Sequence, residues 1–122
     1  MAAKTPADMP GLVDERFNSG DIDQMLELYE DGAAFLPPGG AVLQGDAMRR
    51  AVAGFLATGA KLKHERAETQ IIETGDLSLI ISPWRLSGGT GPDGQPVAMS
   101  GVVHAVVRRQ TDGSWRVVID AI

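Results

Sequence analysis

The sequence predicts a single α+β domain, with helices in its first half and an antiparallel sheet in its second. Apolar residues recur at helical spacing up to about residue 56, and strand-like runs rich in Val, Ile and Trp follow from Leu62 onward. Glycine-containing turn signals separate those runs. Helices that come before the strands, rather than alternating with them, favour α+β over a parallel α/β sheet.

Three helices are predicted after a short arm of residues 1–8, which we expect to be flexible. The first helix runs from about residue 8 or 10 to 18 and is stopped by Ser19-Gly20. The second begins at Asp21 and continues to about residue 31, because apolar residues as far as Tyr29 keep helical spacing. The third opens at Gly45-Asp46 and carries one apolar stripe, which needs a sheet to cover.

The strands are predicted from the runs between turn signals. A short strand at 33–36 leads into a loop at Pro37-Pro38-Gly39-Gly40, and the main strands are expected at 62–74, 77–87, 97–110 and 115–121. The segment 89–94 matches the dinucleotide pattern G-x-G-x-x-G, but a strand follows it where a helix is required. It is therefore interpreted as a hairpin turn.

Composition excludes several classes of function. The net charge of −5 offers no attraction to phosphate backbones, so we expect no nucleic-acid partner. There are no cysteines and only two histidines, so neither a disulfide framework nor a typical zinc site is expected, and no cofactor is indicated. No secretory signal or membrane-length apolar run is present, which favours a cytoplasmic location for one domain spanning 1–122.

Several segments together resemble one known superfamily. They follow in order along nearly the whole chain: Asn18-Ser19-Gly20-Asp21-Ile22-Asp23, Leu28-Tyr29-Glu30-Asp31-Gly32-Ala33, Gly45-Asp46-Ala47-Met48-Arg49, Trp84-Arg85-Leu86-Ser87-Gly88, Pro92-Asp93-Gly94 and Arg108 to Trp115. In this order they are similar to the nuclear transport factor 2-like superfamily, in particular its SnoaL-like and ketosteroid-isomerase-like branch. The resemblance implies a cone-shaped, cystatin-like curved antiparallel sheet with three helices on its concave face, an internal pocket and a homodimer.

The chain departs from the ketosteroid isomerases at the catalytic positions that the resemblance identifies. The place of their general base falls in Leu36-Pro37-Pro38, and the place of their tyrosine falls at Val13. Their remaining acid falls at His104 or Ala105. Steroid isomerisation by that mechanism is therefore disfavoured.

Candidate site residues come from the predicted strands and apolar stripes. His104 lies in a run of valines, where a polar side chain needs a partner, and Asp120 is placed to orient it or to act as a base. We expect these two to be catalytic, with substrate-binding positions at Tyr29, Phe35, Phe55, Ser82, Trp84 and Ser100. Core packing remains an alternative for the aromatic residues and for His104, as does a solvent-exposed strand end for Asp120. His64 is assigned no chemistry, and Asp14 is expected on the solvated side of the first helix.

Two functions remain open. The leading one is a small-molecule-binding domain with an apolar pocket, working as a cofactor-independent isomerase, cyclase or hydrolase. The alternative is a non-catalytic dimerisation or protein-interaction module whose cavity is filled by its own side chains. A cavity of about 300 Å³ or more that His104 faces would support the first, and a filled cone the second.

Overall fold

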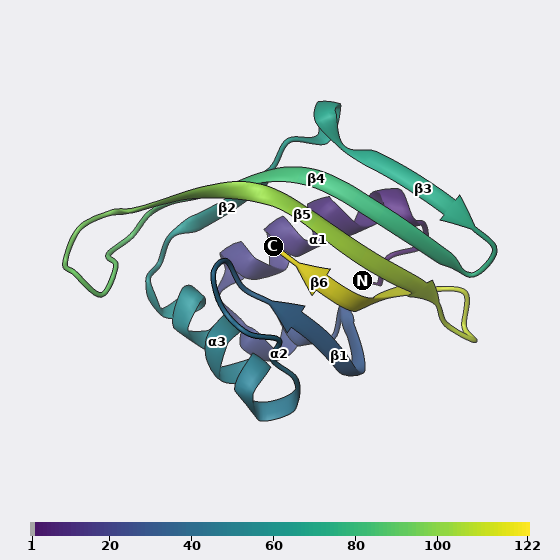
Figure 1. The fold of residues 1–122 in the computed structure, drawn as a ribbon, viewed down its shortest axis with the longest axis horizontal. Coiled ribbons are helices and arrows are strands. Elements are labelled where there is room, and N and C mark those ends of the chain that lie inside the picture. The colour runs from purple at the N-terminus through teal and green to yellow at the C-terminus, as the bar shows by residue number, and fades with distance from the viewer. Residues whose placement is uncertain (1) are drawn as a thin grey trace.

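A computed structural model describes residues 2–122 as three α-helices packed on one face of a six-stranded sheet (Figure 1). The predicted α+β class is confirmed. The helices are α1 (Met9–Ser19), α2 (Ile22–Leu26) and α3 (Gly45–Ala57). The strands are β1 (Tyr29–Leu36), β2 (Lys61–His64), β3 (Gln70–Thr74), β4 (Leu77–Gly88), β5 (Val97–Arg109) and β6 (Trp115–Ala121). Two 3₁₀ turns, Pro6–Asp8 and Arg66–Glu68, complete the elements.

The break between α1 and α2 follows its sequence signals. Gly20 ends α1 with a φ of 79°, a left-handed conformation that glycine adopts without steric cost. Asp21 then caps α2, since its carboxylate accepts hydrogen bonds from the backbone N–H groups of Asp23 and Gln24. The second helix is shorter than predicted, however, and Tyr29 opens β1 instead of closing the helix.

The sheet is mixed and not wholly antiparallel. Its order is β1-β6-β5-β4-β2, and β3 pairs with the other half of the same β4 edge. β1 runs parallel to β6, whereas the remaining pairs are antiparallel. The predicted strand over 62–74 is divided by the turn at Arg66–Glu68, so that β2 and β3 pair with different parts of one long strand.

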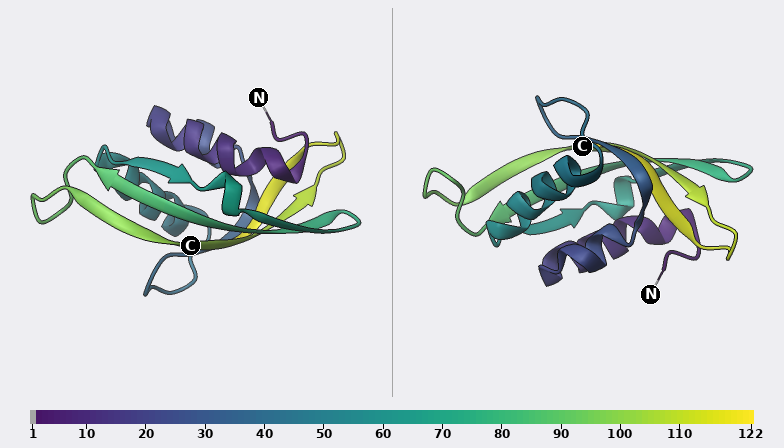
Figure 2. Two further views of the ribbon diagram at one scale, coloured as in Figure 1. Left: turned by 90° about the horizontal axis from the view of Figure 1, so that it is seen from above. Right: turned by 90° about the horizontal axis from the view of Figure 1, so that it is seen from below.

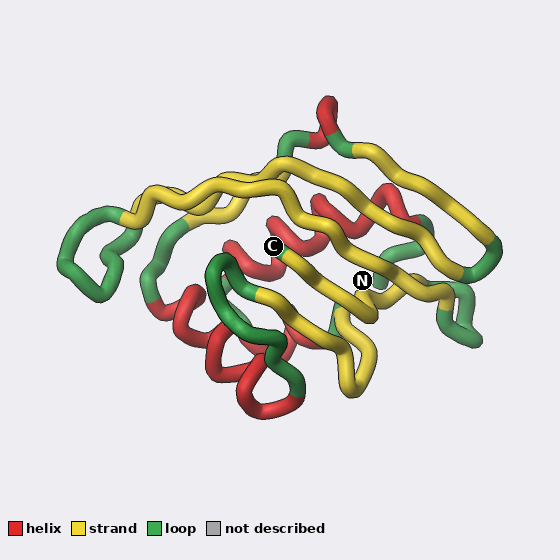
Figure 3. Tube along the Cα trace, in the orientation of Figure 1, coloured by secondary structure: helices red, strands yellow, loops and turns green. Residues whose placement is uncertain are grey.

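The turn predicted at 89–94 is as expected. The segment 89–94 lies in the loop of the β4–β5 hairpin, which Figure 3 shows as the long green loop at one end of the sheet. Backbone bonds from Gly91 to Gln95 and from Gly94 to Gly91 close it. A strand and not a helix follows this loop, so its glycines form a turn and do not form a dinucleotide-binding motif.

The helices cover only one face of the sheet, which we call the inner face; the opposite face is the outer face (Figure 2). On β4 the alternate residues from Ser78 to Leu86 are buried on the inner face, and those from Leu77 to Ser87 point outward. The loop between β1 and α3 extends past the sheet on the outer side (Figure 2). The core therefore lies between the inner face and the helices.

Two residues of the expected flexible arm, Ala3 and Pro6, are buried, and the other described residues of the arm are exposed. Ala3 is fully buried and forms a bridge with Trp115, whose backbone N–H donates to the Ala3 carbonyl at 2.9 Å. Asp8 accepts hydrogen bonds from the backbone N–H groups of Lys4 and Thr5. Met1, the first residue of the expected arm, lies outside the described residues.

No helix between residues 2 and 122 is both long enough and apolar enough to span a membrane.

Candidate functional site

An apolar cavity of about 90 Å³ lies between the inner face and the helices. Its volume is below the roughly 300–1,000 Å³ of pockets for drug-sized ligands and of the order of the roughly 150 Å³ engineered cavity that admits benzene. Most of its wall is aliphatic and aromatic, and its polar side chains are Tyr29, His64, Trp84 and Asp120. The cavity is smaller than the about 300 Å³ expected of a small-molecule-binding domain, and His104 does not line it, so only a compact, mostly apolar molecule would fit.

The first polar group in the wall is an imidazole held by a carboxylate. His64 Nδ1 lies 2.6 Å from Asp14 Oδ1, and the backbone N–H of His64 donates to Asp14 Oδ2 at 2.9 Å. The side chains are 8% and 15% exposed, so the pair is largely shielded from water. A carboxylate on Nδ1 fixes the orientation of the ring and leaves Nε2 as the nitrogen available for proton exchange.

The pair is positioned by a match of spacing between α1 and β2. Asp14 and Asn18 are four residues apart on α1, which is about 6 Å along a helix. Leu62 and His64 are two residues apart on β2, which is about 6.6 Å along a strand. Asn18 accepts the Leu62 N–H at 2.8 Å and donates to its carbonyl at 2.9 Å, while Asp14 accepts the N–H of His64. Helix side chains thus satisfy the free edge of β2 and fix His64 in place.

The second polar group is a phenol bonded to a buried carboxyl. Tyr29 Oη donates to Asp120 Oδ2 at 2.6 Å, and both side chains are buried. Burial raises the pKa of Asp120 from its usual value, although the Tyr29 bond and the charge of a protonated His64 act in the opposite direction. Burial likewise raises the pKa of Tyr29 well above its ordinary value, and the neighbouring Asp120 charge adds to the rise. Asp120 is therefore biased towards its neutral, proton-donating form.

The third polar group is the indole of Trp84. Trp84 is the cross-strand partner of His64 on β2 and of Gly101 on β5, so the three residues form one row across the inner face. The indole lies over Gly101, where a Cβ would be 3.0 Å from Cζ2 and 3.1 Å from Nε1. Among the described residues, the Nε1–H of Trp84 has no hydrogen-bond partner although it is buried.

Five of the predicted site residues line this cavity: Tyr29, Phe35, Phe55, Trp84 and Asp120. Ser82 is on the inner face as expected, but it is fully buried and its hydroxyl is 2.7 Å from that of Thr69. It therefore lies outside the cavity wall.

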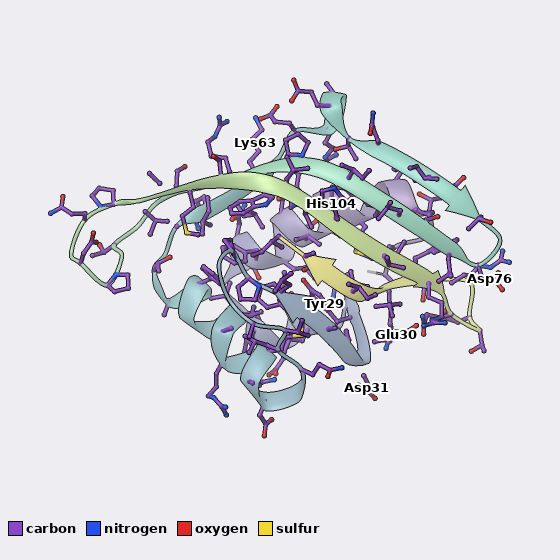
Figure 4. The ribbon with its side chains drawn as sticks, in the orientation of Figure 1. Tyr29, Glu30, Asp31, Lys63, Asp76 and His104 are labelled. Carbon is purple, nitrogen blue, oxygen red and sulfur yellow. The ribbon has the colours of Figure 1, made fainter. Side chains whose placement is uncertain are left out.

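His104 and Ser100 were placed on the wrong face. Both are exposed on the outer face, where His104 pairs with Ile81 and Ser100 with Arg85. Figure 4 labels His104 on β5 and Tyr29 on β1. His104 does not reach the cavity, and it is not the partner of Asp120. The physical reason is that the segment Val102 to Val107 has apolar residues on both faces of the strand. Alternation therefore does not show which face is turned towards the helices.

Two side chains of the candidate site were not among the predicted residues. His64 was assigned no chemistry, although the alternation of Lys61 and Lys63 with Leu62 and His64 places the histidine on the apolar side of β2. Asp14 was expected in solvent, and it is instead turned towards β2. Nothing in the local sequence of α1 shows that contact, because the two residues are 50 positions apart.

Between residues 2 and 122, His, Asp and Glu side chains form no group of three or more that could hold a metal ion.

Comparison with known proteins identifies the family of this chain. The model of the SnoaL-like domain family matches residues 11–118. No curated protein matches the sequence.

Solved structures show the same fold. A "Putative calcium/calmodulin dependent protein kinase II association domain" from Xanthomonas campestris superposes with TM-score 0.79 at 14% identity, covering 94% of this chain and 81% of that one. A "putative dehydratase from the NTF2-like family" of Streptomyces avermitilis gives 0.71 at 21% identity, covering 94% and 88%. A ketosteroid isomerase-like protein from Erwinia carotovora atroseptica gives 0.76 at 18% identity, covering 94% and 88%. The family match and these folds together establish that the chain belongs to the SnoaL-like domain family and has the nuclear transport factor 2-like fold.

Proposed function

We propose that this protein binds a small, mostly apolar molecule in the inner cavity and moves a proton on it, as a cofactor-independent isomerase. One observation carries the proposal: two hydrogen-bonded acid–base pairs, Asp14–His64 and Tyr29–Asp120, supply polar groups to the wall of an otherwise apolar cavity. Burying such groups costs free energy, and titratable groups shifted by burial gather at functional sites. The name of the Erwinia relative, ketosteroid isomerase-like, is consistent with this class of reaction.

In this proposal His64 is the base. Its Nδ1 is held by Asp14, so Nε2 takes a proton from a carbon of the substrate while Asp14 stabilises the imidazolium that forms. The electron pair of the broken C–H bond moves into the substrate. Return of a proton to a second atom of the substrate completes an isomerisation, with no atom gained or lost.

Asp120 is the group that returns a proton or donates a hydrogen bond to the developing charge. Its burial raises its pKa and favours the neutral carboxyl, and the Tyr29 bond fixes its orientation. A protonated His64 lowers the pKa of Asp120, so the two sites are electrostatically coupled. Proton gain at His64 therefore assists proton loss at Asp120, and release of the His64 proton to solvent with uptake of a proton by Asp120 restores the starting state of the protein.

The cavity volume limits the substrate. About 90 Å³ is less than the roughly 150 Å³ of a cavity that admits benzene, so even a single ring requires the wall to move outward, and a fused polycyclic skeleton is too large. Steroid-sized molecules are not proposed.

Deuterium exchange tests this function without knowledge of the physiological substrate. Three six-membered-ring carbon acids serve as probes in D₂O: cyclohexanone, nitrocyclohexane and cyclohexanecarbonitrile. We expect the protein to accelerate exchange of the acidic C–H of at least one probe. Proton NMR measures the rate of exchange. His64→Gln should lower the accelerated rate by about 100-fold or more, because it removes the base.

His104→Gln is the matched control, since this histidine lies on the outer face. It should exchange the probes at the wild-type rate. Equal rates in the two variants, or no exchange above buffer with any probe, would reject the proposed chemistry.

The outer face favours a second proposal, that the protein is a homodimer through its sheet. Four large apolar residues of this face are 39–55% exposed: Ile72, Leu77, Val102 and Ile119. Ile72 pairs with the half-buried Leu79, and Ile119 pairs with the half-buried Val106. Exposed apolar patches of this kind mark association sites in soluble proteins. If the protein forms this dimer and has no catalytic activity, it corresponds to the alternative function given above, a non-catalytic dimerisation module.

Light scattering tests the dimer. At micromolar concentration we expect twice the chain mass of 12.9 kDa, and a wild-type monomer would reject the proposal. Val102→Glu places a charge in the patch and should give the monomer. Ala53→Glu, on the exposed side of α3, introduces the same charge elsewhere and should stay dimeric. The expected cytoplasmic location stays a prediction.

A further inference from the structure

Part of the cavity wall has to move before a ring-shaped ligand can enter. The cavity holds about 90 Å³, whereas roughly 150 Å³ is the size of a cavity that admits benzene. Close-packed interiors do not expand evenly, because each buried side chain is held by its neighbours. The movement is therefore expected where the wall is least buried and least bonded to the rest of the fold.

The mouth of the cavity is marked by the wall residues that reach solvent. In the described part of the chain four wall residues are half-buried, and the other wall residues are buried: the four are Val13, Phe55, Leu62 and Ile122. A small molecule that enters the folded protein has to pass between these four side chains. One of them must give way.

Three of the four are held in place by hydrogen bonds between elements. Leu62 is bonded through both its N–H and its carbonyl to Asn18 of α1. Val13 belongs to the same helix, so the contacts that hold α1 against β2 also limit its movement. The backbone N–H of Ile122 donates to the Leu36 carbonyl of β1 at 3.1 Å.

Phe55 is the fourth, and the helix that carries it is less buried. It lies in the last turn of α3, and of the 13 residues of that helix only Met48 and Val52 are buried. Both precede Phe55 by one turn or more. Regions with few buried apolar contacts are the ones that open at the lowest free energy.

The backbone around Phe55 favours a movement of the ring over a movement of the whole helix. The Thr90 N–H of the β4–β5 hairpin donates to the Thr58 carbonyl at 2.8 Å, which holds the chain just after α3. Gly54 directly precedes Phe55, and no atom lies within 4 Å of the position of an added Cβ. No packing contact therefore requires glycine there, and glycine gives this turn more backbone freedom than another residue would.

We propose that Phe55 is the gate of the inner cavity and the residue that limits the size of its ligand. With the ring inward the cavity has its volume of about 90 Å³, and with the ring turned to solvent the space of one phenyl ring is added. Exposing the ring to water costs free energy, so the closed state dominates without a ligand. The inference rests on the proposed function, since it requires the cavity to be the binding site.

Two probes test the gate: benzene has one ring, and indole has two fused rings. Binding is followed by NMR through the methyl signals of Ile80, Val103 and Val117, which line the cavity. Phe55→Ala removes the gate and the conformational step that limits entry. Benzene should then exchange at least about tenfold faster than in the wild type, and indole should bind about tenfold more tightly.

Leu56→Ala is the matched control. Leu56 is the next residue of α3 and is also half-buried against the core, but it is not part of the cavity wall. This variant should exchange benzene and bind indole as the wild type does. Phe55→Leu retains more of the packing and serves where Phe55→Ala does not fold, and its exchange rate should lie above that of the wild type.

The outcomes separate the gate from the site. Equal benzene exchange in the wild type and the Phe55 variants would overturn the gate while leaving the cavity as the binding site. Equal acceleration by Phe55→Ala and Leu56→Ala would indicate a general loosening of α3 and would also overturn it. Methyl signals that neither probe changes in any of these proteins would overturn both this inference and the proposed function.

Discussion

His64 Nδ1 lies 2.6 Å from Asp14 Oδ1, and this contact joins β2 to α1 across 50 positions of the sequence. The same carboxylate accepts the backbone N–H of His64, so one side chain completes the edge of a strand and orients an imidazole. Fold and proposed chemistry therefore both depend on Asp14. The effects of replacing it are separated only if stability and activity are both measured.

Asp14→Asn should lower the free energy of unfolding by about 1–3 kcal/mol, because the amide cannot accept both bonds from His64 and leaves a buried group poorly paired. Urea unfolding measures the change. The exposed neighbour Glu15 provides the control, and Glu15→Gln should stay within about 0.5 kcal/mol of wild type. Equal stability of the two variants would show that the Asp14 contacts contribute nothing.

The buried carboxyl of Asp120 predicts a specific dependence of stability on pH. Burial raises its folded-state pKa above the ordinary 3.8, so the folded state holds this proton more tightly than the unfolded state. The stability that the protonated Asp120 contributes is fully present below the ordinary pKa and is lost as the pH rises through the raised pKa. The stability of Asp120→Asn minus that of wild type should therefore increase with pH across this window. Chemical denaturation at a series of pH values measures the difference, and a decrease would contradict the raised pKa.

Tyr29→Phe separates the phenol from the carboxyl that it binds. The Tyr29 bond lowers the pKa of Asp120 against the effect of burial, so its removal should raise that pKa further. Titration of the Asp120 carboxyl carbon by NMR measures the shift. We also expect a loss of stability of about 1 kcal/mol from the 2.6 Å bond. A lower pKa in the variant would mean that the phenol does not stabilise the carboxylate.

Gly101→Ala should destabilise the protein by about 1–3 kcal/mol, because its Cβ would stand 3.0 Å from the Trp84 ring and the indole would have to move. Gly54→Ala is the matched control on α3, where no atom lies within 4 Å of the added Cβ. The control should stabilise the protein by about 0.5–1 kcal/mol, since alanine favours a helix over glycine. Thermal unfolding followed by tryptophan fluorescence measures both, and destabilisation by the two variants alike would remove the argument from the indole.

Much of the fold was predictable because the signals that set it are local. Ser19-Gly20-Asp21 stops one helix and caps the next through contacts within three residues, and the glycine turns separate the later strands. The predicted ends of helices and strands were wrong where pairing between distant strands overrides a local pattern. Tyr29 continues the helical spacing of α2, yet pairing with Val117 on β6 and burial of its ring draw it into β1. The parallel direction of β1 had no local signal at all.

The candidate site was only partly predictable, because it depends on which face of each strand is turned inward. For β4, the expected substrate-binding residue Trp84 does line the cavity. For β5, the apolar residues on both sides of His104 gave no indication of which face is turned inward. Pairing with Ile81 places the histidine on the outer face. Pairing with Trp84 placed the overlooked His64 inside.

The sequence by itself determined the class of fold, the order of its helices and strands and the absence of cysteine chemistry. Those properties follow from composition, periodicity and turn residues, which act over a few positions. Only the tertiary structure decided the polar contents of the cavity: it joined Asp14 to His64, Tyr29 to Asp120, and left the Trp84 N–H without a partner. The physical reason is that strand register and helix docking, set by contacts 50 and 91 positions apart, decide which polar groups share a buried space.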